Sequence, residues 1–506
     1  MNVNVTMDQQ RCAEIFERVR RAAEATDVEV AVKGGRSALT RFANNGITQN
    51  VSEEGCTVSV RVQIGGRTAR ATTNCFDEES LRRVVGQAEA LARVQEEDKE
   101  LLPMLTAAEQ GSAPVLDRRC AETAAMGAGE RAEHVEGMVA IARRDGLNAA
   151  GVYASGESFE ALFNSHGVVR WHTESLAEAS ITMQAGDSSG WQKQNYTSAA
   201  RLDARALAEI AAEKALRSAR PVELPPGKYT VILEPSAVVD LIGFLAADFS
   251  GLALLEQRSC LNGRLGTKLF GENISIVDDV RDAGQTGPGF DGEGVGRQGL
   301  TLVENGVVRG VALARGTAAR MHGSETEEKV AGTGATGNAS LPAAGARSGN
   351  ASLPAAGARS GNAALPAAGG RTGAWPTGHG LSLPNEGGEA ATNIVFRVAD
   401  GDRKTVEEMI AATEYGLLVT RLWYIREVDA YEKILTGMTR DGTFLVEGGR
   451  VGKGIRNFRF NQSVVLMLKQ VLDLGAPVRA CGEEAFDMVA PAMRVGGFQF
   501  TEVTRF

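Results

Sequence analysis

The stretch "LEPSAVVDLIGFLAADFSG", residues 233–251, joins the end of an apolar strand to a helix of small and apolar residues. Functional side chains are often mounted at such a junction, so its polar residues matter most. Ser236 follows Pro235, as an N-cap residue would, and it has no adjacent base that could activate it as a nucleophile. Asp240 and Asp248 are the only ionisable residues of the predicted helix. Taken alone, the stretch therefore predicts a core helix.

The sequence before this stretch predicts two units of mixed helix and strand. Residues 1–110 contain a helix, a strand, a hairpin that turns at Gly65-Gly66 and a second helix. Residues 111–220 contain a helix, three alternating segments typical of an antiparallel meander, and a closing helix. The segment "RPVELPPGKY", residues 220–229, then interrupts regular structure with three prolines and a glycine. We predict a domain boundary near residue 220.

Residues 221–506 predict a mainly β domain with few helices. Asn305-Gly306 and Gly448-Gly449 each separate two alternating segments, as in tight hairpins. Thr405 and Glu408 have the spacing of a helix capping box. The fold class predicted for the chain is α+β: an N-terminal α/β domain of helices and antiparallel strands, followed by the mainly β domain.

A twelve-residue repeat interrupts the C-terminal domain between Gly337 and Thr372, where "GNASLPAAGARS" occurs twice and is followed by "GNAALPAAGGRT". Its Gly, Ala, Ser and Pro residues cannot bury enough apolar surface to offset the entropy of ordering. We predict a disordered insertion at about residues 323–376. A weakly basic tether for an acidic partner is the alternative.

Overall composition indicates an ordinary globular protein with reduced cysteines. The net charge of −9 and pI of about 5.4 argue against a nucleic-acid partner, which would need clustered Lys and Arg. The six cysteines include no CxxC pair. No apolar run is long enough to cross a membrane, and the first residues do not resemble a secretory signal. These features predict a cytoplasmic protein without membrane contact.

Four carboxylates could form a second site. Asp278 and Asp279 end a predicted strand, and Asp291 and Glu293 follow in "FDGEGV", residues 290–295. They could bind a divalent ion if the loop folds back, or accept backbone N–H groups in turns. None of the five histidines has helical metal-binding spacing with another.

Several segments together resemble the TldD/PmbA family, also called the modulator-of-DNA-gyrase family. They are "LTRFANNGITQNVSEEGCTVSVRV", "VILEPSAVVDLIGFLAADFSG", "ISIVDD", "FDGEGV", "LVTRLWYIREVD", "TGMTRDGTFLVEGG" and "APAMRVGGFQF". The resemblance spans the chain apart from the repeats. It implies an N-terminal α/β domain, a mainly β C-terminal domain and intracellular peptide cleavage by a two-subunit metallopeptidase.

The catalytic branch of that family carries an HExxxH motif, whose histidines hold zinc, on the helix that matches residues 235–249. The resemblance places Gly243, Phe244 and Asp248 at the His, Glu and His positions. Cys481 matches the cysteine that is the third ligand in that branch. We expect no metal in this chain, with Asp248 and Cys481 as the candidate ligands if one binds.

The chain therefore resembles the non-catalytic, PmbA-like branch. The implied role is to complete a peptide groove for a catalytic, zinc-bearing TldD-like subunit that acts on unfolded or small peptides. Candidate groove or interface residues are Asp291, Glu293, Thr439 and Arg440. Two alternatives stay open: an active peptidase whose altered metal site combines Asp248, Cys481 and a histidine such as His379, and a stand-alone peptide-binding scaffold whose repeats recruit a partner.

Overall fold

The computed structural model describes residues 7–322 and 375–504. The predicted insertion at 323–376 falls almost wholly outside these residues. Within the described part, no helix combines the length and hydropathy that crossing a lipid bilayer requires.

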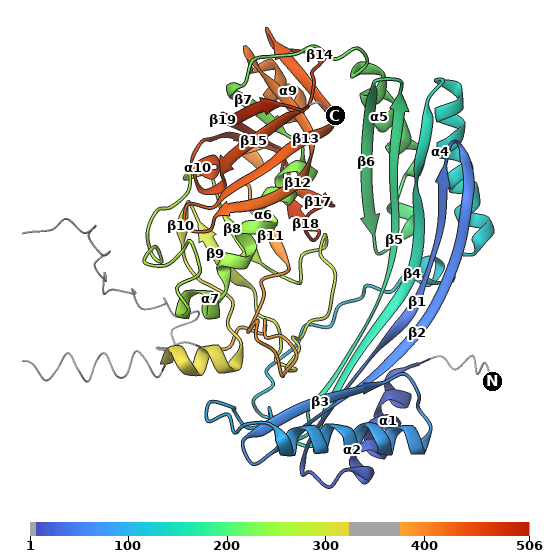
Figure 1. Ribbon diagram of the computed structural model, residues 1–506, viewed down its shortest axis with the longest axis vertical. Coiled ribbons are helices and arrows are strands. Elements are labelled where there is room, and N and C mark those ends of the chain that lie inside the picture. Colours follow the sequence, from blue (N-terminus) through green and yellow to red (C-terminus); the bar gives the residue numbers. More distant parts are fainter. Residues whose placement is uncertain (1–6, 323–374, 505–506) are drawn as a thin grey trace, which may run out of the picture.

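The N-terminal half is built on one long antiparallel sheet of six strands in the order β3-β2-β1-β4-β5-β6 (Figure 1). The sheet therefore runs without interruption through both predicted N-terminal units. Its strands are β1 (Asp27–Ala43), β2 (Gly46–Ile64), β3 (Arg67–Thr73), β4 (Asn148–Asn164), β5 (Val169–Ala185) and β6 (Ser188–Tyr196).

Two groups of helices cover this sheet at different places along its length. The helices α1 (Gln9–Ala22) and α2 (Glu78–Val94) pack at the β3 end (Figure 1). The helices α4 (Ala128–Arg144) and α5 (Ala204–Arg217) form a separate core with β5. The short elements α3 (Ala121–Ala125) and η1 (Ala199–Arg201) lie between the longer ones in sequence.

Strand β1 contains two adjacent glycines, Gly34 and Gly35, where it lies between β2 and β4. A Cβ atom at Gly34 would lie 2.5 Å from the carbonyl oxygen of Gly55, and one at Gly35 would lie 2.1 Å from that of Glu157. The glycines let three strands approach closely at this point, so β1 passes through them to Ala43.

The C-terminal half contains a closed ring of strands. Strands β12, β7, β19, β15 and β13 pair in that order, and β13 pairs again with β12. Strand β14 pairs with β13, and β16 pairs with β19. The members are β7 (Gly227–Leu233), β12 (Tyr415–Asp429), β13 (Ile434–Glu447), β14 (Arg450–Gly454), β15 (Phe458–Ser463), β16 (Val471–Leu474) and β19 (Met493–Val503).

A third sheet of short strands lies beside the ring, in the order β10-β9-β8-β11-β18-β17. Its strands are β8 (Ile276–Asp278), β9 (Leu300–Glu304), β10 (Val307–Val308), β11 (Ile394–Phe396), β17 (Val478–Ala480) and β18 (Met488–Ala490). The remaining elements in this half are η3 (Asp400–Asp402), α9 (Val406–Ala411) and α10 (Val464–Lys469).

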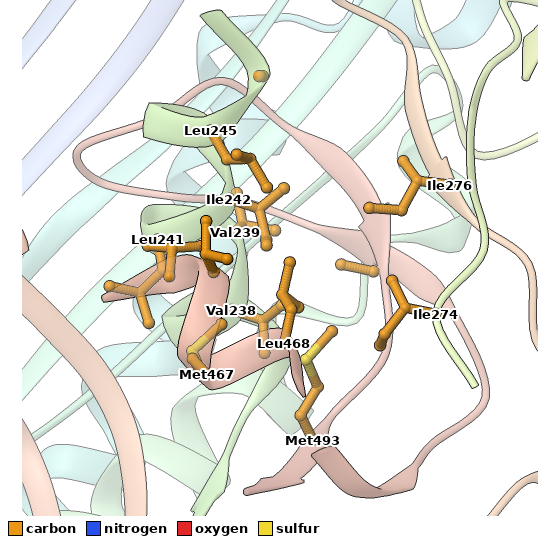
Figure 2. Close-up of a cluster of buried hydrophobic side chains, with 14 of the residues drawn as sticks. Val238, Val239, Leu241, Ile242, Leu245, Ile274, Ile276, Met467, Leu468 and Met493 are labelled. Carbon is orange, nitrogen blue, oxygen red and sulfur yellow. The ribbon is translucent and has the colours of Figure 1, made fainter. Parts of the chain in front are cut away.

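Helix α6 (Pro235–Ala246) is the centre of the C-terminal core, and the short η2 (Ala247–Phe249) and α7 (Gly251–Leu255) continue from it. Figure 2 shows its apolar side chains packed against side chains from α10, from β19 and from the chain at and just before β8. The apolar side chains of α6 are Val238, Val239, Leu241, Ile242 and Leu245, and their neighbours are Ile274, Ile276, Met467, Leu468 and Met493.

The predicted fold class is confirmed: helices and antiparallel strands are followed by a mainly β region. The predicted hairpin turns are present, with Asn305 and Gly306 at φ 49° and 78°. Thr405 and Glu408 form the predicted capping box. The N-cap prediction for Ser236 was wrong. Glu234 holds the N-cap position, and the helix begins at Pro235, whose fixed φ suits the first helical residue.

Candidate functional site

A pocket of about 710 Å³ opens beside α6, at the positions that the resemblance aligns with the catalytic motif. One part of its wall is apolar and the other carries charged side chains. The lining residues are Gly243, Phe244, Ala247, Asp248, Ala253, Arg258, Glu427, Lys433, Glu483, Glu484, Ala485 and Phe486. The C-terminal end of α6 with η2, the β12–β13 hairpin and the loop after β17 thus meet at one place.

Gly243 leaves no space for the histidine that the catalytic motif requires. A Cβ atom built at Gly243 would lie 2.3 Å from the Cβ atom of Ala485. Real Cβ atoms do not approach so closely, so any larger side chain at this position would displace the loop that carries Ala485. Phe244, at the glutamate position, has no group that could accept a proton.

Asp248 forms one hydrogen bond and one ion pair within the protein. Its Oδ1 accepts the backbone N–H of Cys260 at 2.7 Å, and its Oδ2 lies 2.5 Å from Nζ of Lys433. Lys433 also donates to Oε2 of Glu427 at 2.5 Å. An ammonium group therefore lies between two carboxylates in this pocket. A zinc ion could not share Asp248 without displacing Lys433, so the residues at the motif positions do not fit a metal.

The charge of Lys433 is stabilised despite its burial. Burial alone would lower the pKa of this ammonium, but the carboxylates of Asp248 and Glu427 outweigh burial and raise the pKa above its ordinary value. Lys433 is thus a permanent cation at neutral pH. Its backbone, with φ of 46°, lies at the tip of the β12–β13 hairpin.

Asp240 fixes the loop that covers Gly243. Its Oδ1 accepts the backbone N–H groups of Glu483 and Glu484 at 2.8 and 2.9 Å. Its Oδ2 is buried and has no hydrogen-bond partner among the described residues. Burial raises the pKa of this carboxyl to about 7, although the two N–H groups favour the ionised form.

We expect Asp240→Asn to change how stability depends on pH. Asp240 has a pKa of about 7 in the folded protein, against an ordinary value of 3.8. As the pH rises, this carboxyl therefore loses its proton at a lower pH in the unfolded chain than in the folded protein. Its contribution to stability is therefore present below pH 4 and is lost as the pH rises to about 7, by up to about 4 kcal/mol. Asparagine keeps the Oδ1 acceptor but does not titrate.

Urea unfolding at several pH values, from about 4 to about 8, measures this effect. The gap between the variant and the wild-type protein should grow with pH in favour of the variant. The pKa of Glu293 is also raised to about 7, but Glu293 is present in both proteins. Its contribution therefore cancels when the unfolding free energies of the two proteins are subtracted. Parallel pH profiles for the two proteins would contradict the assignment to Asp240.

Cys481, the candidate third ligand, is buried and lies outside the pocket wall. Burial raises the pKa of its thiol, and the carboxylate of Asp487 adds to this effect. Without a bound cation beside it, this thiol stays protonated at neutral pH.

His379, the candidate histidine, has other partners. Its Nε2 lies 2.9 Å from Oδ1 of Asp278, and its Nδ1 lies 2.8 Å from Oγ1 of Thr377. Across residues 7–322 and 375–504, no group of three or more His, Cys, Asp or Glu side chains has an arrangement that could hold a metal ion. The structure thus places Asp248, Cys481 and His379 in three different environments.

The loop with Asp291 and Glu293 does fold back, toward His379 and Gly380. Oδ1 of Asp291 accepts the N–H groups of Glu293 and Val295, and its Oδ2 accepts that of Gly380 at 2.7 Å. The Glu293 carboxyl accepts the N–H of Arg315, while burial and the charge of Asp291 raise its pKa to about 7. Both side chains are buried, and these contacts are those of turn capping. Asp279 instead pairs with Arg397.

Thr439 and Arg440 differ in exposure although they are adjacent on β13. Thr439 is buried, and its Oγ1 accepts the backbone N–H of Phe458 at 3.0 Å. Arg440 is half exposed, with its guanidinium 4.9 Å from the ring centre of Trp423. Of the candidate groove residues, only Arg440 therefore presents its side chain to solvent. Their roles in binding stay predictions.

Sequence reasoning missed Lys433, Glu427, Glu483 and Glu484, which together give the pocket its charge. Each lies in a hairpin or loop with the composition of an ordinary exposed turn. No local signal could have found them, because only the β12–β13 pairing and the third sheet bring them to α6.

Sequence profiles of one family match nearly all of the chain. The one described as the PmbA/TldA metallopeptidase C-terminal domain matches residues 226–502, and those described as domain 1 and the central domain match residues 28–92 and 104–219. A metalloprotease of Methanothermobacter thermautotrophicus is 29% identical over 208 residues, which are 38% of this chain and 45% of that protein.

A metalloprotease of Methanocaldococcus jannaschii is 31% identical over 121 residues, 23% of this chain and 26% of that protein. The chain thus spans less than half the length of these curated relatives. The crystal structure of TldE from Thermococcus kodakarensis has the same fold, with a TM-score of 0.76, 18% identity and coverage of 97% of this chain and 99% of that one. With the C-terminal profile alone matching more than half of its residues, the chain belongs to the PmbA/TldD metallopeptidase family.

Proposed function

We propose that this chain is the non-catalytic subunit of a heteromeric metallopeptidase, in which it completes the peptide-binding groove. A catalytic TldD-like subunit would supply the zinc ion and the general base. The substrate would be an unfolded or small peptide, and the complex would act in the cytoplasm. We propose no contact of this chain with nucleic acid or with a membrane.

The observation that carries the proposal is the state of the motif positions on α6. Gly243 is closed over by Ala485, Phe244 is apolar, and Asp248 binds Lys433. None of the three positions carries the chemistry of a zinc peptidase, yet they lie at a pocket of about 710 Å³. A pocket without catalytic groups supports binding without cleavage by this chain.

The pocket has the composition of a peptide-binding site. Apolar side chains from α6 and the loop after β17 line it together with six charged side chains, so the pocket can contact both apolar and charged groups of a peptide. Neighbouring strands could also hold an extended peptide by main-chain hydrogen bonds.

Metal content and peptidase activity of the purified chain test the proposal first. Elemental analysis of protein prepared without chelator should give less than about a tenth of an equivalent of zinc, because an intact zinc site normally retains its metal. The chain alone should not hydrolyse an unstructured fluorogenic peptide. Co-expression with a family member that carries HExxxH should give a complex with chelator-sensitive activity.

Other outcomes would favour the alternatives. About one equivalent of zinc, or chelator-sensitive hydrolysis by the chain alone, would overturn the proposal in favour of an altered active site; Asp248 and Cys481 would then be mutated first. Peptide binding without any complex with a catalytic family member would instead favour a stand-alone scaffold. Deletion of residues 337–372 would show whether the repeats contribute to a complex.

A further inference from the structure

Lys433 has a donor that the protein does not use. An ammonium group has three N–H donors, and the described residues supply two acceptors, Asp248 and Glu427. The side chain is 5% exposed, yet it forms part of the pocket wall. A buried charge with a spare donor at a pocket wall is costly unless a ligand or water accepts from it.

The position of this ammonium is also informative. Asp248 stands where the resemblance places the second histidine ligand of the catalytic branch, and it binds an internal cation there. A metal in a peptidase attracts the carbonyl oxygen of its substrate. A lysine ammonium can hydrogen-bond to the same oxygen, but it provides no activated water.

The other pocket residues narrow the class of ligand. Four carboxylates line the pocket, Asp248, Glu427, Glu483 and Glu484, against two bases, Arg258 and Lys433. The excess of acids disfavours a free carboxylate as the group that contacts the ammonium. It favours a neutral carbonyl oxygen there, with a cationic group of the ligand near the acids.

The apolar part of the wall fits the stem of such a cationic side chain. Phe244 and the 39% exposed Phe486 line the pocket together with Glu483 and Glu484. Lys and Arg side chains place their methylene groups on apolar surface and their charge beside acids. Oε1 of Glu484 accepts the backbone N–H of Tyr424 at 2.8 Å, whereas its Oε2 lies 3.5 Å from Arg426. Oε2 of Glu483 lies 3.5 Å from Arg421, so the Oε2 atoms of both acids keep capacity for a ligand.

We propose that Lys433 replaces the catalytic metal with a fixed ammonium that binds the main-chain carbonyl oxygen of a peptide, whose neighbouring Lys or Arg side chain lies against Phe486 and Glu484. This inference rests on the proposed function and adds a substrate class to it: basic, extended peptides that this chain holds for the catalytic subunit.

Fluorescence anisotropy with the full-length chain tests the inference. The probes are labelled ten-residue peptides, amidated at the C-terminus, that differ only in a central Arg, Ala or Glu. The Arg peptide should bind about tenfold more tightly than the Glu peptide, because one charge-assisted hydrogen bond between the peptide's Arg and Glu484 would increase affinity by about that factor. Lys433→Met should weaken binding of all three peptides about tenfold. Glu484→Gln should reduce only the preference for Arg.

Lys214→Met is the matched control. Lys214 is also nearly buried, and its ammonium contacts Glu234 at 2.7 Å and Gln192 at 3.0 Å, but it does not line the pocket. Its loss should leave peptide affinity unchanged. If Lys433→Met does not fold, the double variant with Asp248→Asn removes one of the two carboxylates that would be left unpaired.

The outcomes separate this inference from the proposed function. Unchanged affinity in a folded Lys433→Met protein, no binding of any peptide, or tighter binding of peptides with a free C-terminal carboxylate would overturn it. A complex with the catalytic family member could still form in each case. Zinc in the chain alone would overturn the proposed function and the assignment of Lys433 together.

Discussion

Glu29→Ala should lower the free energy of unfolding by about 3–5 kcal/mol, because it leaves the buried guanidinium of Arg61 and the half-buried guanidinium of Arg70 without their carboxylate. Glu29 is 1% exposed; its Oε2 lies 2.7 Å from Arg61 and its Oε1 lies 2.6 Å from Arg70. Burial alone would raise the pKa of Glu29, but the two arginines outweigh it and lower the pKa. The cluster also joins the two halves of the chain, since Arg70 donates to the carbonyl oxygen of Leu383.

Urea unfolding followed by circular dichroism measures the effect, with Glu136→Ala as the control. Glu136 pairs with Arg143 on the surface, where both side chains are more than half exposed, and its removal should cost less than about 1 kcal/mol. A Glu29→Ala protein as stable as the Glu136→Ala protein would show that the buried cluster does not stabilise the fold.

The second large effect is expected for Glu389→Ala. This carboxylate is 4% exposed and accepts four hydrogen bonds, from the Ser250 hydroxyl and the Leu252 N–H on one oxygen, and from the Ala314 N–H and the Thr317 hydroxyl on the other. Alanine leaves buried donors unpaired, and the unfolding free energy should fall by at least about 3 kcal/mol.

Glu389→Gln provides the comparison, because an amide retains one acceptor oxygen at nearly the same place. It should be destabilised less than the alanine variant. The Ser250 hydroxyl and the Leu252 N–H, which donate to Glu389, lie at the start of α7, and Ala253 of this helix lines the pocket. Peptide binding should therefore weaken in the alanine variant as well. Equal stability of the two variants would contradict a hydrogen-bonding role for Glu389.

Much of the fold could be predicted because its signals are local. The alternating strands and the glycine turns at Gly65-Gly66 and Gly448-Gly449 depend on backbone conformation within a few residues. The extent of the long sheet could not be read in this way. Strands β1 and β4 are separated by more than a hundred residues, and only packing brings them together.

The position of the candidate site could be predicted from the sequence, but the contacts of its side chains could not. The resemblance located the helix at residues 235–249, and the residue types at Gly243 and Phe244 already argued against zinc chemistry. Asp248 looked like a free oxygen ligand in sequence. Its engagement by Lys433, 185 positions further along the chain, follows only from the β12–β13 hairpin folding against α6.

By itself, the amino-acid sequence determined the α+β class, the family and the absence of the HExxxH motif, because these depend on local patterns and on the identity of single residues. Only the tertiary structure decided what replaces the motif: Ala485 over Gly243, and an ammonium between two carboxylates at Asp248. Contacts between residues far apart in sequence depend on how strands pair and pack, and no local pattern records that pairing.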